Sequence, residues 1–180
     1  MPDSSVHTIK DQIFFQYAKI IAVSAYHCKD AAEAKKKYYW FIKSTFKKLQ
    51  QDEMQWSTIL REDKQMLDEE KKCAYCGVTE KLSRDHIVPK SLNVNERCTT
   101  CDKIQWISNH IRACQSCNSK KSDNWLYHFR KKIHSENPKY YDTLPPLLEK
   151  KYLKTMYCCH QCKGDLNKVV EGISVLDLDL

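Results

Sequence analysis

Four cysteines, arranged in two Cys-x-x-Cys pairs, are the side chains of this sequence best suited to bind a metal. Cys73 and Cys76 form the first pair, and Cys114 and Cys117 form the second, after an interval of 37 residues. Two pairs of this spacing can place four thiolates around one tetrahedral Zn²⁺. The interval is longer than in a plain zinc ribbon. We therefore expect a zinc frame that holds further functional side chains.

Inside this frame are side chains that could hydrolyse a phosphodiester. Asp85 and His86 are adjacent, Asn109 lies further on, and Asn118 directly follows the last cysteine. An imidazole can take a proton from an attacking water. Carboxylate and amide oxygens suit a hard divalent cation, which stabilises charge on the phosphate. Taken singly, the same residues could be a surface hydrogen bond, a turn residue and a helix cap.

Residues 72–133 resemble the HNH endonuclease family, whose fold is the ββα-metal motif. The resemblance rests on the order and spacing of four pieces: Cys73-x-x-Cys76-Gly77, Arg84-Asp85-His86-Ile87-Val88-Pro89-Lys90, Asn109, and Cys114-x-x-Cys117-Asn118-Ser119-Lys120-Lys121. Two departures stand out. The last motif residue is Asn rather than His, and Cys98-x-x-Cys101 replaces the glycine-rich turn of many relatives.

The resemblance implies a role for each matching residue. His86 is expected to be the general base, with Asn109 holding its imidazole in orientation. Asp85 and Asn118 are expected to bind a catalytic Mg²⁺ or similar ion, and the four framing cysteines a structural Zn²⁺. His110 is expected on the opposite strand face, away from the site. Basic side chains near the motif are candidates for phosphate contacts: Arg84, Lys90, Lys120 and Lys121.

The remaining cysteines suggest a second zinc ion. Cys98 and Cys101 form one two-thiolate half-site, and Cys159 and Cys162 form another near the C-terminus, where the sequence resembles a zinc-knuckle turn. Two alternatives remain open: unliganded thiols, or a different combination of the pairs around two ions. Cys28 is expected to be a buried apolar side chain.

Charge is unevenly distributed along the 180 residues, whose net charge is +7. Residues 71–164 carry 18 basic and 8 acidic side chains, whereas residues 1–70 are balanced with 11 of each. A positive field around the motif attracts phosphate, although a solvated lysine-rich surface would give the same composition. Ten cysteines in a chain without an apparent export signal favour metal binding over a disulfide scaffold.

The hydrophobic pattern predicts an α+β fold in three parts. Residues 1–71 form two or three helices, which begin near residues 8, 30 and 52. Residues 72–135 form the zinc-stabilised ββα core, with strands at 82–90 and 104–113 and a helix from about residue 118. Residues 136–180 contain a connector, a short helix at 147–157, the cysteine-rich knuckle, and an acidic tail that forms an edge strand or a frayed end.

The sequence thus favours a metal-dependent HNH endonuclease that acts on DNA, with RNA the less favoured substrate. Restriction, phage, mobile-element and defence settings all remain open. One alternative is a non-catalytic zinc module that binds nucleic acid. Another is a nuclease subunit activated by a partner protein, or a homodimer, through the N-terminal helices. No membrane segment or signal peptide is recognised, so we expect a cytoplasmic protein.

Overall fold

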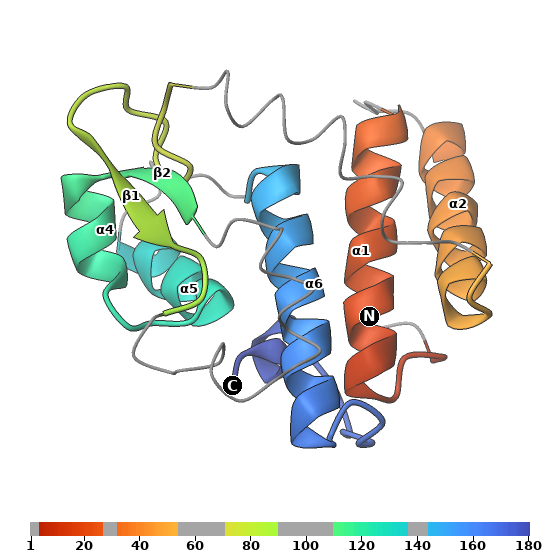
Figure 1. Ribbon diagram of the computed structural model, residues 1–180. Coiled ribbons are helices and arrows are strands. Elements are labelled where there is room, and N and C mark those ends of the chain that lie inside the picture. Colours follow the sequence, from red (N-terminus) through yellow and green to blue (C-terminus); the bar gives the residue numbers. More distant parts are fainter. Residues whose placement is uncertain (1–3, 27–31, 54–70, 90–109, 137–143) are drawn as a thin grey trace.

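The computed structural model describes residues 4–26, 32–53, 71–89, 110–136 and 144–180 (Figure 1). Its long central helix, α6 (Pro146–Lys163), has helices on one side and a strand–strand–helix unit on the other. On the first side α1 (Ile9–Tyr26) packs against α6, and α2 (Ala32–Gln50) packs against α1. On the second side lie β1 (Leu82–His86), β2 (His110–Cys114), α4 (Gln115–Lys121) and α5 (Leu126–Glu136). The α+β class predicted from the sequence is confirmed.

The first helix begins where the sequence predicts it. The Asp11 carboxylate accepts hydrogen bonds from the Thr8 backbone and hydroxyl groups, and the Thr8 hydroxyl accepts one from the Asp11 backbone. This reciprocal capping satisfies N–H groups that have no partner within the helix. Ile13 and Tyr17, one turn apart on the predicted apolar stripe, are fully buried. Helix α1 therefore forms because its apolar stripe coincides with a good cap.

The second helix buries apolar side chains and exposes those of its lysines that the structure describes. Ile42, Phe46 and Leu49 are buried, while Lys43 and Lys47 are exposed. The predicted start at residue 30, the residue Cys28, and nearly all of the predicted third helix lie outside the described residues.

The two strands form an antiparallel ribbon with a well-defined register. Leu82 pairs with Cys114, Arg84 with Arg112, and His86 with His110. Since directly opposed residues share a face, these pairs lie on one face of the ribbon and the pair Asp85–Ile111 lies on the other. The first strand is shorter than predicted, because it ends at His86 rather than near residue 90.

One long helix after the second strand was predicted, but two short helices are present. Helix α4 begins at Gln115, three residues earlier than expected, and ends at Lys121. Ser122 then takes a positive φ of 43°, and the Asn124 side chain bonds to the Lys121 carbonyl group, so the chain turns before α5 begins. Hydrophobic spacing did not reveal this break, because the apolar stripe of α5 begins only after the turn.

The C-terminal predictions need two corrections. Helix α6 continues through the cysteines to Lys163 and is capped by Gly164, so the expected knuckle turn at residues 159–164 is absent. Gly164 has a φ of 82°, a left-handed value that favours glycine at a helix end. The tail is neither an edge strand nor frayed. It forms the short helix η4 (Val175–Leu178), with Leu178 fully buried and Ser174 as its cap.

A buried apolar cluster joins the two sides of the molecule, with members from α1, α2, β2, α5, α6 and the tail, while Leu82 of β1 packs against it. The Tyr127 ring meets Tyr152 edge-on across the α5–α6 contact, with ring centroids 5.4 Å apart. Within the described ranges, no helix combines the length and apolar character needed to cross a bilayer.

Candidate metal centre

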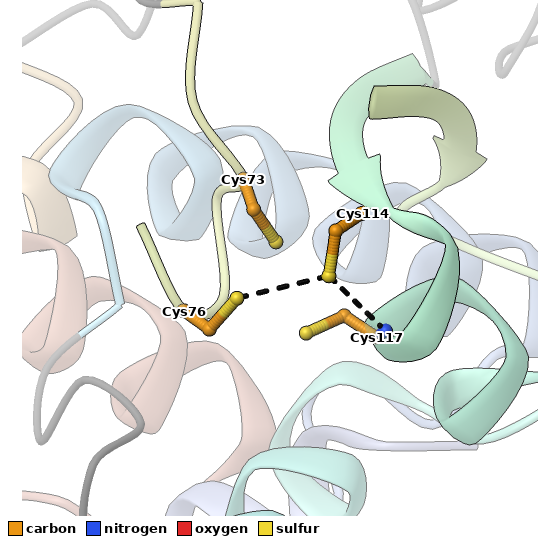
Figure 2. A group of neighbouring side chains, drawn as sticks. All are labelled: Cys73, Cys76, Cys114 and Cys117. Atoms are coloured by element: carbon orange, nitrogen blue, oxygen red, sulfur yellow. Dashed lines mark hydrogen bonds between the residues drawn. The ribbon is translucent and has the colours of Figure 1, made fainter. Parts of the chain in front are cut away.

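The four framing cysteines come together at one end of the ribbon (Figure 2). Their sulfur atoms all lie within 4.8 Å of one another, and those of Cys76 and Cys114 are 3.7 Å apart. Four thiolates around a tetrahedral Zn²⁺ at 2.3 Å would have sulfur atoms about 3.8 Å apart. The cluster therefore fits the predicted structural metal ion, such as zinc.

Local backbone structure explains why these sulfur atoms converge. The Cys73 carbonyl group accepts a hydrogen bond from the Gly77 N–H, and Gly77 has a φ of 77°, a value that glycine adopts without strain. The Ala74 N–H donates to the Arg112 carbonyl group and so ties this turn to β2. Cys114 ends β2 and caps α4, where its sulfur accepts from the Cys117 N–H at 3.4 Å.

The electrostatics of the four thiols indicate how a bound cation would change their ionisation. A hydrogen bond from the Cys117 thiol lowers the pKa of Cys73 to about 4 and raises the pKa of Cys117. Burial raises the pKa of Cys76 to about 11. The Cys73 thiolate is thus stabilised by its neighbours, while ionisation of Cys76 and Cys117 is opposed. A bound divalent cation removes this opposition and allows all four sulfur atoms to ligate as thiolates.

Asp85, the predicted ligand for a catalytic ion, is turned into the interior. Its side chain is buried, and one carboxylate oxygen accepts a 2.7 Å hydrogen bond from the Tyr75 hydroxyl group. The other oxygen faces the Lys121 ammonium group at 3.9 Å. Burial, followed by the neighbouring Asp85 charge, raises the pKa of Tyr75 well above its usual value. The tyrosine therefore stays a hydrogen-bond donor.

Lys121, predicted to contact phosphate, is fully buried on α4. Its ammonium group donates a 2.6 Å hydrogen bond to the carbonyl oxygen of His86 and faces Asp85. Burial lowers the pKa of Lys121, and the Asp85 charge partly opposes that shift. This placement corrects the surface role expected for Lys121. The side chain instead joins α4 to the end of β1.

Asn118, the second predicted ligand for the catalytic ion, is half-buried and bonds to the same strand. Its amide group donates to the Ser83 hydroxyl group at 3.1 Å and to the Arg84 carbonyl group at 3.3 Å. The Asp85 carboxylate faces the ammonium group of Lys121. The two residues therefore do not form an open cation site in this structure, and their joint binding of Mg²⁺ stays a prediction.

His86, the predicted general base, lies on the other face of the ribbon beside His110. The two rings are directly opposed across the strands, with centroids 4.4 Å apart and planes inclined by 60°. His86 is half-buried and His110 is exposed. The expectation that His110 faces away from His86 is wrong, because opposed residues of an antiparallel pair share a face.

Two arginines continue this face of the ribbon. Arg84 and Arg112 are directly opposed, and both are exposed. Like charges in this position repel each other, so a bound anion would stabilise the face. Lys120, also predicted to contact phosphate, is exposed on α4. We call Arg84, Arg112, His86 and His110 the basic ribbon face.

Several predicted site residues cannot be placed. Asn109, Lys90, Cys98 and Cys101 lie outside the described residues. Cys159 is buried on α6 and is not part of a disulfide, whereas Cys162 is exposed and disulfide-bonded, so it is not a thiolate that could ligate zinc. The disulfide argues against Cys162 as a ligand of the predicted second zinc ion, and the Cys98–Cys101 half of that site stays a prediction.

Sequence reasoning missed three neighbours of the predicted site. Tyr75 lies between the first two cysteines, and nothing in a Cys-x-x-Cys spacing indicates a partner for Asp85. Arg112 and His110 lie two residues apart on β2, as Arg84 and His86 do on β1. This matched spacing could have indicated the basic ribbon face once the strand register was known.

Comparison with known proteins does not extend this description. No family model matches the chain, and no curated protein or solved structure is significantly similar to it.

Proposed function

We propose that the protein is a zinc-framed HNH-type endonuclease that hydrolyses phosphodiester bonds in DNA. The basic ribbon face is the observation that carries this proposal. Two opposed arginines there suit a phosphate backbone, and His86 lies beside them as a candidate base. The order strand, strand, helix with a four-cysteine cluster supports the same proposal. The proposal includes a cytoplasmic location, where the four framing cysteines would stay reduced for zinc, although the disulfide at Cys162 argues against it.

In the proposed reaction His86 takes a proton from the attacking water while the arginines hold the phosphate. The backbone carbonyl group of His86 is bonded to Lys121, whose helix is anchored through Cys117. The zinc cluster would therefore act indirectly, by keeping α4 and the end of β1 in place. A divalent ion, if Asp85 and Asn118 bind one, would add positive charge at the phosphate.

Substitution of the proposed base gives the most direct test. His86→Ala should lower the cleavage rate of plasmid DNA in Mg²⁺ or Mn²⁺ by about 10²- to 10⁴-fold, the usual contribution of a general base. Zinc content and circular dichroism should remain unchanged. His134→Ala, an exposed histidine on α5, is the matched control and should cut at the wild-type rate. Full turnover by the His86 variant would contradict the mechanism.

A non-catalytic zinc module that binds nucleic acid is the second candidate. The buried Asp85 carboxylate favours it, because this group is paired with Lys121 and Tyr75 rather than open to an ion. The same plasmid assay separates the two candidates. Salt-dependent DNA binding that weakens in Arg84→Gln and Arg112→Gln, with no cleavage in any divalent ion, would support the binding module and reject the nuclease.

A further inference from the structure

His86 and His110 hold two imidazole rings close enough together to bind one metal ion. The residues are directly opposed at one end of the ribbon, with ring centroids 4.4 Å apart. Imidazole nitrogens bind transition metals at about 2.0–2.1 Å, so two rings at a right angle around one ion have centroids about 4.6 Å apart. The observed separation of the ring centroids is therefore compatible with a chelating pair.

We propose that His86 and His110 form a second metal site, which takes a borderline transition-metal ion such as Ni²⁺, Cu²⁺ or Zn²⁺. Imidazole nitrogens favour these ions, whereas Mg²⁺ prefers oxygen ligands. A right angle between the two metal–nitrogen bonds would suit octahedral or square-planar coordination, with water in the remaining positions.

This site is distinct from the cysteine centre. Cys114 pairs with Leu82 at one end of the ribbon, and His110 pairs with His86 at the other, four residues along each strand. At about 3.3 Å per residue, the two ends are about 13 Å apart. The ligand types also differ, because the cysteine centre offers four sulfur atoms and the histidine site two nitrogen atoms.

The surroundings make the histidine site weak and exchangeable. His110 is exposed, and two protein ligands leave most of the coordination sphere to solvent. Arg84 and Arg112, the next pair on the same face, repel a dication. A zinc ion at the cysteine centre would instead be enclosed by four sulfur ligands.

A metal ion at this site would regulate the proposed reaction, an inference that rests on the proposed function. An imidazole nitrogen that ligates an ion has no lone pair left to accept a proton from water. Ions that favour nitrogen would therefore inhibit cleavage supported by Mg²⁺. The binding site itself does not depend on the protein being an enzyme.

The test uses the full chain with its structural zinc bound. Ni²⁺ is titrated by calorimetry, and the histidine ring signals are followed by NMR, since Ni²⁺ broadens signals of nearby nuclei. We expect one Ni²⁺ per chain, with the zinc retained and the His86 and His110 rings broadened first. His86→Ala and His110→Ala should each weaken binding by at least about tenfold, and His134→Ala should leave it unchanged.

The readouts separate the site from the function. The proposed metal site would be contradicted if Ni²⁺ bound wild type and His86→Ala with equal affinity. It would also be contradicted if Ni²⁺ bound only by exchange into the cysteine centre. Nickel binding by a chain that cuts no DNA would reject the proposed function and retain the site. If the chain does cut DNA, the cleavage rate with Ni²⁺ divided by the rate without it should be lower in wild type than in His110→Ala. Equal ratios would overturn the regulatory inference.

Discussion

The two sides of α6 are stabilised in different ways. On the helical side, comprising α1, α2, α6 and the tail, apolar residues such as Ile13, Leu148 and Leu153 are buried together. On the zinc side, residues 71–89 and 110–136, a two-stranded ribbon and the short α4 surround four cysteines and a buried Asp–Lys–Tyr group. A two-stranded ribbon is marginal on its own. The zinc side also buries apolar residues, such as Ile87, Ile111 and Phe129, so a metal ion bound by the cysteines would add to apolar burial there rather than replace it.

Loss of the metal should show the largest difference between the two sides. A structural zinc of this kind contributes about 10 kcal/mol or more of binding energy that is coupled to folding. Cys117→Ser, or chelation of the wild type, should therefore unfold the zinc side, while most helical circular dichroism from α1, α2 and α6 persists. Elemental analysis and NMR of the ribbon residues would measure this.

Cys158→Ser is the matched control for that experiment, because Cys158 is a half-buried cysteine on α6, outside the cluster. It should keep the ribbon signals and the metal of the four-cysteine centre. A folded ribbon in metal-free Cys117→Ser protein would show that the zinc side does not need its ion.

The buried ion pair should give the next largest effect. Lys121→Met leaves the Asp85 carboxylate buried without its ammonium partner, a change that typically costs about 3–5 kcal/mol. Denaturant unfolding would measure it, with Lys120→Met, an exposed neighbour on α4, as the control. The double variant Lys121→Met, Asp85→Asn should recover part of the loss. A fully stable Lys121→Met protein would contradict the interior role assigned to Lys121.

On the helical side, apolar packing should be the sensitive property. Leu148 is fully buried on α6, so Leu148→Ala should cost about 2–5 kcal/mol through lost burial and the cavity left behind. Its zinc content should remain that of the wild type. Val23→Ala, at a side chain that is 54% exposed, should cost far less. Loss of zinc from Leu148→Ala would show that the two sides are not separately stabilised.

The difference between the helical side and the zinc side also explains what could be predicted from the sequence. The amphipathic stripes of α1 and α2 were readable because their burial follows helical periodicity, as with Ile42, Phe46 and Leu49. The cysteine cluster was readable because zinc ligation imposes a strict spacing on residues of one type. Neither prediction required knowledge of contacts between distant residues.

The predictions that failed depended on such contacts. The partners of Asp85 follow from the strand register and from the way α4 crosses β1, and neither is encoded in local spacing. His110 was expected to face away from His86 because the register was unknown. The cysteines at 158–162 suggested a turn, yet helix α6 continues past them to its cap at Gly164.

The smallest effect should come from a buried carboxyl group on the helical side, that of Glu149. Glu149 on α6 accepts hydrogen bonds from the Gln16 side chain and the Tyr127 hydroxyl group. Burial raises its pKa above the usual value of 4.5, although Gln16, Tyr127, Arg130 and Lys19 oppose the shift. The folded protein therefore keeps this proton at a pH where the unfolded chain has released it.

The sign of the pH effect follows from that difference. Since the folded state binds more protons, the contribution of Glu149 to the free energy of unfolding falls as pH rises from about 4.5 through the raised pKa. Glu149→Gln keeps a hydrogen-bond acceptor and cannot ionise. The difference in unfolding free energy between variant and wild type should therefore grow in favour of the variant over that window and then level off. A difference independent of pH would show that the pKa of Glu149 is the same in the folded and unfolded states, which would contradict the effect of burial assigned to this carboxyl group.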